Sequence, residues 1–226
     1  MSTESGIPDF RSPGGLWSRS QPVLFQDFLR DADARREYWR QKSIAHTDFA
    51  TARPNVGHVT LARWESAGHL HGIITQNIDG LHQDAGSQAV LELHGTARWV
   101  ACLKCAARFE PDPLVKAFLE TNEVLPCPQC GGLLKHATVS FGQQLPEEVL
   151  DEAVSWPRTC DLFLAIGSSL VVEPAASLPR LAVQSGARLA IINRDPTNQD
   201  HSAELLFHAS IGETLAGVDQ ALRAMT

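Results

Sequence analysis

The sequence has little of what a membrane protein or a nucleic-acid-binding protein requires. It carries 19 lysines and arginines against 26 aspartates and glutamates, a formal net charge of −7, so it lacks the broad basic face that non-specific nucleic-acid binding requires. Its longest mostly apolar run, Leu162–Val172, has 11 residues, far fewer than the roughly 20 that span a bilayer. The first ten residues show no basic or apolar segment typical of a signal peptide. We therefore expect a cytoplasmic protein that binds neither membranes nor nucleic acid.

Cysteine is also scarce, and its number is odd. Five cysteines in 226 residues do not suit a small secreted protein held together by disulfides. Apolar residues make up 43% of the chain and charged residues 20%, which is typical of a globular protein and excludes a disordered one. This length predicts one large domain with a smaller module.

Four of the five cysteines form two C-x2-C pairs, Cys102 with Cys105 and Cys127 with Cys130. A C-x2-C turn directs two thiolates at one ion, so two such turns complete a tetrahedral four-sulfur zinc site. A site with four protein ligands has no open position, so we expect one structural Zn²⁺ and no metal catalysis. Two disulfides are the alternative, and the odd count disfavours it. Cys160 precedes an apolar segment and is expected to be a small core residue.

Short apolar segments alternate with helical patterns in the second half of the chain. The alternation predicts an α/β fold with a Rossmann-like parallel sheet. The expected strands are His71–Thr75, Val90–His94, Ala137–Phe141, Asp161–Ile166, Arg188–Asn193 and Leu205–Ala209. Helices are expected from Asn55 to Gly68, after Pro146, from Pro174 to Gly186 and from Ile211 to Met225. We assign 1–18, 55–96 and 137–226 to the Rossmann-like domain, with a helical part at 19–54 and the zinc-binding module at 97–136 inserted into it.

Polar residues follow two of the expected strands. Gln76, Asn77 and Asp79 come directly after the first strand, and ligands of open α/β sheets bind at the carboxyl ends of strands. Amides and a carboxylate there can hold a ribose or a carboxamide; a turn in which Asp79 only caps a helix is the equal alternative. His94, followed by Gly95, ends the next strand and is a candidate proton acceptor, although a single histidine is more often structural.

Two later strand ends and one early loop complete the pattern. Gly167, Ser168 and Ser169 form a small-residue turn that can bind phosphate or ribose. Asn193, Arg194 and Asp195 follow the next strand, where an amide or acid often holds an adenosine ribose. In the loop Ser5–Arg11, Arg11 can pair with a phosphate and Phe10 can cover a ring, although an ordinary surface turn is the simpler interpretation. Together these strand ends predict a nucleotide-binding cleft.

The motifs occur in the order SGIPDFR, TQNID-x-LH, HG, two C-x2-C pairs, FG-x-x-LP, GSSL-x-V-x-PA and IN. This order resembles the sirtuins, the NAD-dependent protein deacylases, and especially their bacterial type. The resemblance implies that NAD and an acyl-lysine protein react in the cleft to give nicotinamide, deacylated lysine and O-acyl-ADP-ribose. It implies His94 as general base, with Asn77 and Asp79 positioning ribose and nicotinamide. The other cofactor contacts it implies are Phe10, Arg11, Gln76, Ile78, Gly167, Ser168, Ser169, Asn193, Arg194, Asp195 and Ile211.

The resemblance also implies a groove in which the substrate peptide adds as a strand, lined by Phe141, Gly142, Val171, Val172 and Glu173. ADP-ribosyl transfer by the same site, and a truncated chain with little or no activity, are the alternatives. We expect a monomer.

Two departures from the family pattern carry further expectations. Sirtuins have a strand and a G-A-G-[IV]-S turn before the equivalent of Ser2, and Met1 stands at the Ile or Val position; we expect a longer natural chain. Desuccinylating sirtuins carry a Tyr-x-x-Arg pair, whereas Tyr38 here is followed by Gln41 at the arginine position, with Arg40 one residue off. We therefore expect an acetyl or a longer neutral acyl group as the substrate.

Overall fold

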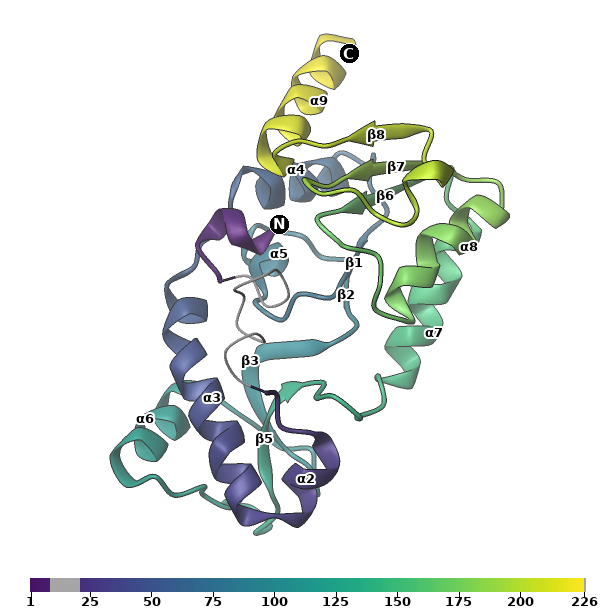
Figure 1. Ribbon diagram of the computed structural model, residues 1–226. Helices are drawn as coiled ribbons and strands as arrows, with labels where there is room; N and C mark the ends of the chain where they lie inside the picture. The colour runs from purple at the N-terminus through teal and green to yellow at the C-terminus, as the bar shows by residue number, and fades with distance from the viewer. Residues whose placement is uncertain (9–20, 226) are drawn as a thin grey trace.

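The computed structural model describes residues 1–8 and 21–225. The larger part, in the upper half of Figure 1, contains five parallel strands in two sheets. Strand β1 (Ile73–Thr75) pairs with β2 (Val90–Glu92), and β6 (Leu162–Ile166), β7 (Arg188–Ile192) and β8 (Leu205–Phe207) follow one another in the second sheet. The prediction of an α/β fold with parallel strands is confirmed. Within the described residues, the two sheets are separate because β1 and β6 are not paired with each other.

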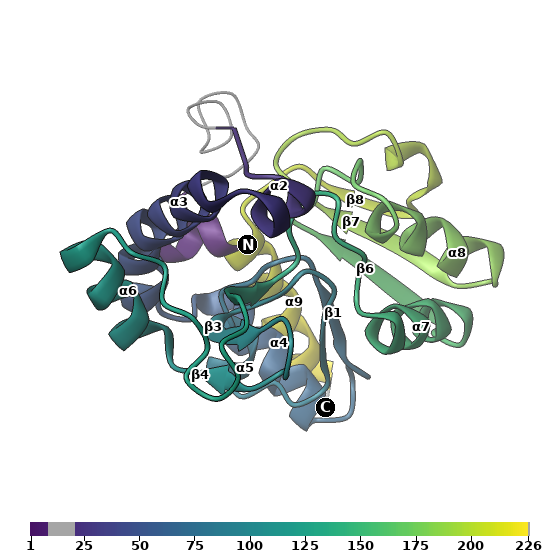
Figure 2. The ribbon, with the colours of Figure 1, turned by 90° about the horizontal axis from the view of Figure 1, so that it is seen from below.

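Helices cover both faces of the parallel strands (Figures 1 and 2). Helices α4 (Val56–Ser66) and α9 (Ile211–Met225) pack on one face around Ile73 and Ile192. Helices α7 (Glu147–Ser155) and α8 (Leu178–Gln184) pack on the other face, around Leu93. The short turns of 3-10 helix are Ser2–Ser5, Trp156–Arg158, Ala175–Ser177 and Asp200–Ser202. This three-layer arrangement leaves the carboxyl ends of the strands open to a ligand.

Helix α4 begins and ends where the sequence indicates. The Asn55 side chain accepts hydrogen bonds from the backbone N–H groups of Gly57 and His58, and the His58 ring accepts one from the Asn55 N–H. This reciprocal cap satisfies N–H groups that have no partner within the helix. Gly68, with φ 76°, then turns the chain away.

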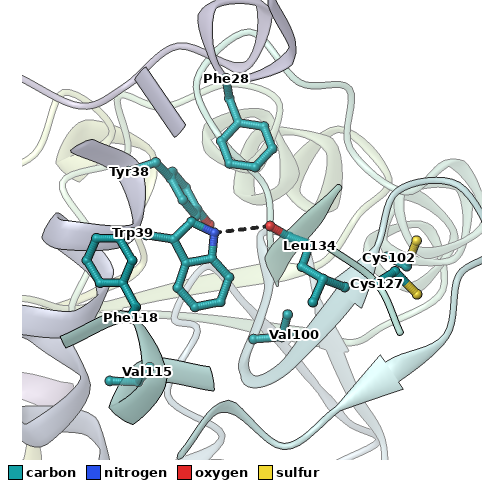
Figure 3. Packing of buried hydrophobic residues seen from close by; sticks show 9 residues of the cluster. All are labelled: Phe28, Tyr38, Trp39, Val100, Cys102, Val115, Phe118, Cys127 and Leu134. Carbon is teal, nitrogen blue, oxygen red and sulfur yellow. Dashed lines mark hydrogen bonds between the residues drawn. The ribbon is translucent and has the colours of Figure 1, made fainter. Parts of the chain in front are cut away.

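The smaller module, in the lower half of Figure 1, combines an antiparallel sheet with helices. Its sheet has the order β4 (Arg108–Phe109), β3 (Gly95–Cys102), β5 (Leu134–Thr138), and its helices are α2 (Phe25–Arg30), α3 (Ala32–Thr51) and α6 (Pro111–Thr121). Figure 3 shows their shared core, in which the Trp39 indole N–H donates to the Leu134 carbonyl at 3.1 Å. The helical segment and the cysteine segment are therefore packed together as one unit.

The strand expected at Ala137–Phe141 is wrong in position and in partner. The structure has β5 at Leu134–Thr138, three residues earlier, and pairs it antiparallel to β3. Lys135 and His136 are almost fully buried in this strand. Because both side chains are polar, the apolar pattern did not indicate that a strand begins there.

Three buried histidines predict that the fold is sensitive to acid. Burial lowers the pKa of His58 to about 3, of His82 to about 4 and of His136 to about 3. Each ring stays neutral in the folded chain but takes up a proton below about pH 6.5 in the unfolded chain. The contribution of each histidine to stability is therefore complete above pH 6.5 and is lost as the pH falls. Between pH 7 and pH 5 we expect the free energy of unfolding to fall by about 2 kcal/mol for each histidine.

Urea unfolding at the two pH values measures this loss. The variant His82→Gln should have a smaller pH dependence than the parent chain, whereas His69→Gln, at an exposed position, should retain the full dependence. Equal unfolding free energies at pH 7 and pH 5 in the parent chain would contradict the prediction.

Candidate functional site

A cavity of about 1770 Å³ lies between the strand ends and the smaller module. Residues after β1, β2, β6 and β7 line it, because the carboxyl ends of parallel strands meet at one edge of a sheet. Its lining includes most of the predicted site residues, namely Gln76, Asn77, Ile78, Asp79, His94, Phe141, Gly142, Gly167, Ser168, Ser169, Val172, Glu173, Asn193, Arg194, Asp195 and Ile211. Val171 does not line the cavity and is 62% exposed. Phe10 and Arg11 lie outside the described residues.

Asn77 and Asp79 are held together by Ser2. The Ser2 hydroxyl donates to an Asp79 carboxylate oxygen at 2.5 Å and accepts from the Asn77 amide at 2.8 Å. The other Asp79 oxygen accepts from the backbone N–H of Leu81 at 2.9 Å, at the start of α5 (Leu81–Asp84). Asp79 therefore forms an Asx-type turn that leads into α5 and also lines the cavity, so the two alternatives from the sequence are compatible. The sequence analysis did not identify Ser2 as a site residue. Only its place in the family motif pointed to it, and no spacing rule did.

Two backbone groups hold His94, one through its ring and one through its own carbonyl. Its Nδ1–H donates to the carbonyl of Gln76 at 3.1 Å, and its own carbonyl accepts from the N–H of Val139 at 2.8 Å. This tautomer places the basic lone pair on Nε2. Gly95 follows with φ 66°, and a Cβ there would lie 2.1 Å from the Ala137 carbonyl oxygen, so only glycine lets β3 pass this close.

Another wall of the cavity is formed at the start of helix α9. The Glu4 carboxylate accepts from the backbone N–H groups of Ile211 and Gly212, both at 3.0 Å, at the start of α9. Gly167, with φ 60°, lies so near that a Cβ would be 2.7 Å from the Ile211 side chain. The Ser168 hydroxyl accepts from the Gln76 amide at 3.4 Å. Motifs that are more than 100 residues apart in the sequence therefore meet at one wall.

The four paired cysteines converge in the smaller module. The Sγ atoms of Cys102, Cys105, Cys127 and Cys130 all lie within 4.8 Å of one another, which is the spacing that one tetrahedral zinc ion needs. A Cβ at Gly132 would lie 2.8 Å from the Cys102 sulfur, so the glycine keeps space beside the ligands. Cys160 lies apart from them and is half-buried. The cluster fits the predicted structural zinc.

Lys42 is a second cavity residue that sequence reasoning missed. It lies on α3 one helical turn after Tyr38, and it lines the same cavity as His94. Residues four apart share one face of a helix, so the spacing from Tyr38 could have indicated it. Arg40 instead pairs with Glu37 on the exposed face, and the Gln41 amide donates to Glu37 and to the Gln21 carbonyl.

A sequence model described as the Sir2 family matches residues 1–174. The chain belongs to the Sir2 family. An NAD-dependent protein deacetylase of Rhodopseudomonas palustris is 51% identical over 95% of this chain and 86% of the relative, and one of Thermodesulfovibrio yellowstonii is 45% identical over 96% and 85%. A solved structure of Sir2 with a p53 peptide and NAD⁺ has a TM-score of 0.88 at 36% identity, covering 99% of this chain and 90% of that one.

In the part of the chain that the structure describes, no helix has both the length and the apolarity to cross a bilayer.

Proposed function

We propose that this chain is an NAD-dependent protein-lysine deacetylase that produces nicotinamide, deacylated lysine and O-acyl-ADP-ribose. One observation carries the proposal: His94, oriented by the Gln76 carbonyl, lines the same cavity as the Asn77–Ser2–Asp79 cluster. The names of the relatives support it, since three relatives at 45–51% identity are each named NAD-dependent protein deacetylase. A Sir2 structure with a deacetylated peptide and acetyl-ADP-ribose, similar over 97% of this chain with a TM-score of 0.88, supports the same reaction.

The chain offers NAD a set of polar groups along one cavity wall. When bound, NAD supplies an electrophilic ribose carbon and nicotinamide as the leaving group. We assign Asn77 and Asp79 to the ribose and nicotinamide, with Ser2 holding both side chains in place. The remaining proposed contacts are Phe10, Arg11, Gln76, Ile78, Gly167, Ser168, Ser169, Asn193, Arg194, Asp195 and Ile211. Preorganised donors of this kind act by orienting the reacting groups.

His94 is the proposed general base. Its Nε2 accepts a proton from a hydroxyl of the bound substrate, while the Nδ1–H bond to Gln76 fixes the ring and its tautomer. The substrate chain is proposed to lie between Phe141–Gly142 and Val171–Glu173. Phe141 is 48% exposed and Val171 is 62% exposed, so both edges are accessible to a protein partner.

The zinc site supports the fold and takes no part in the reaction. Its four thiolates leave no open coordination position. Reduced thiolates also suit a reducing compartment, and we propose that the enzyme acts in the cytoplasm as a monomer. The boundaries 1–18, 55–96 and 137–226 for the NAD-binding domain, 19–54 for the helical part and 97–136 for the zinc module belong to the same proposal.

An assay with an acetyl-lysine peptide and NAD tests the proposed reaction. Nicotinamide, deacetylated peptide and O-acetyl-ADP-ribose should appear in equal amounts, as followed by mass spectrometry. Nicotinamide release without deacetylation would favour ADP-ribosyl transfer to another acceptor. If no nicotinamide is released, the proposed function is wrong for this chain.

A further inference from the structure

The side chain of Arg98 covers the loop that carries Asn77 and Asp79. This loop turns at Gly80, whose φ is 74°, and a Cβ there would lie 2.5 Å from Cδ of Arg98. The apolar stem of the arginine therefore lies directly against the loop backbone, at a point where only glycine leaves room for it. The guanidinium group of Arg98 then forms an ion pair with Asp84, at the end of α5.

Strand β3, which carries Arg98, also holds this loop through its backbone. The N–H of Ala97 donates to the Ile78 carbonyl at 2.8 Å, directly beside the arginine. The strand itself is paired with β5 and ends at Cys102, one of the four clustered cysteines. The loop is therefore attached to the smaller module both by a backbone bond and by the Arg98 side chain.

Three carboxylates lie around the loop, and Arg98 supplies positive charge among them. Asp84 pairs with the arginine, Asp79 lines the cavity, and Glu92 is half-buried at the end of β2. Burial raises the pKa of Glu92 and the charge of Asp79 adds to the rise, whereas the charge of Arg98 opposes it. Because like charges destabilise one another, the repulsion that remains without Arg98 would displace the loop.

We propose that Arg98, through its ion pair with Asp84, is a positioning residue that holds the loop in the conformation that binds NAD. This inference rests on the proposed function, in which Asn77 and Asp79 of the same loop contact the ribose and the nicotinamide. Ser2 holds the side chains of these two residues, whereas Arg98 holds the backbone that carries them. Arg98 does not line the cavity, so it acts through the loop and not by touching the cofactor.

The variant Arg98→Met tests the charge, because an unbranched apolar stem still covers Gly80. The KM for NAD, and its Kd by calorimetric titration, should rise by about fivefold, the upper range for a partly exposed ion pair. At saturating NAD, kcat should stay within about twofold of the parent value, because bound NAD restores the loop conformation. The KM for the acetyl-lysine peptide should not change. A loss of folded protein would instead lower kcat and leave the KM for NAD unchanged.

A double-mutant cycle shows whether the two residues act as a pair. Asp84→Asn should weaken NAD binding in the parent chain but not in the Arg98→Met variant, because the pair is already lost there. Exchange of the charges, by Arg98→Asp together with Asp84→Arg, should bind NAD more tightly than Arg98→Asp alone. Arg108→Met is the matched control, an exposed arginine on β4 of the same module, and should leave the KM for NAD unchanged. An unchanged KM for NAD in Arg98→Met, or additive effects in the cycle, would overturn the proposal while the proposed deacetylase function stands.

Hydrogen–deuterium exchange of the NAD-free chain gives a readout that does not depend on turnover. The N–H groups of Leu81 and Asp84 donate to the Asp79 carboxylate and to the Gly80 carbonyl. Both amides should exchange about fivefold faster in Arg98→Met than in the parent chain, because the loop opens more often. Equal exchange in the two chains would overturn the inference. If no nicotinamide is released, the proposed function fails, and the exchange of this loop still decides the role of Arg98.

Discussion

Replacing His94 with alanine should lower kcat/KM for deacylation by about 10²- to 10⁴-fold, the range that a positioned general base contributes. The reason is local: with Nδ1–H bonded to the Gln76 carbonyl, the basic lone pair of the ring is on Nε2. The backbone around the site should persist, because the bond from the Val139 N–H to the residue 94 carbonyl does not involve the side chain. Steady-state kinetics and calorimetric titration with NAD would show lost turnover with retained binding.

A matched control and a rescue sharpen this test of His94. The variant His201→Gln changes an exposed histidine and should leave kcat/KM unchanged. Added imidazole should restore part of the activity of His94→Ala, because a free base can enter the space that the side chain leaves. Full activity of His94→Ala would contradict the assignment, and loss of NAD binding together with turnover would mean that the residue holds the cofactor instead.

Removal of the zinc should unfold the smaller module. In small zinc-binding modules the metal supplies on the order of 10 kcal/mol, which is comparable with the whole stability of a typical domain. Cys102 and Cys127 belong to the same buried cluster as Tyr38, Trp39 and Leu134 (Figure 3). Loss of the ion should therefore disturb the packing of α3 against β5, and activity should fall as an indirect result.

The variant Cys102→Ser and treatment with a chelator test the zinc site from two directions. We expect less than one zinc per chain by metal analysis, a weaker near-ultraviolet circular dichroism signal and a lower melting temperature. Cys160→Ser is the matched control, since Cys160 lies apart from the four ligands, and it should retain full zinc content. A chelated protein with an unchanged melting temperature and unchanged activity would show that the metal is not structural.

The larger part of the fold could be predicted because the apolar patterns of its strands are local in the sequence. Strand β7 is buried along Leu189–Ile192, so its residues are apolar and the pattern is visible in the sequence. Strand β5 was misplaced because Lys135 and His136 are buried for reasons that depend on distant partners, Tyr38 and Trp39 among them. A polar residue whose burial is made possible by tertiary contacts gives no periodic signal.

The site, too, has residues that the sequence predicts and residues that depend on distant contacts. The strand-end residues around His94 were predictable, because the topology of parallel strands places such residues together. Ser2 was not, since it acts by bridging Asn77 and Asp79 at a separation of more than 70 residues. Lys42 was predictable in principle from its helical spacing to Tyr38, whereas Lys135, which lies beside the same ring, comes from a distant strand.

The contact between Glu4 and helix α9 has a consequence for the order of assembly on the ribosome. Glu4 and Ile211 are 207 positions apart in the sequence, and domains are synthesised from their N-terminal end. The turn Ser2–Ser5 must therefore wait, without its helix partner, until α9 has been translated. The smaller module, whose core and sheet contacts fall within residues 23–138, can form before then. This wall of the cavity can thus close only after α9 has been made, and a nascent chain that stalls before α9 would expose it to the quality-control machinery.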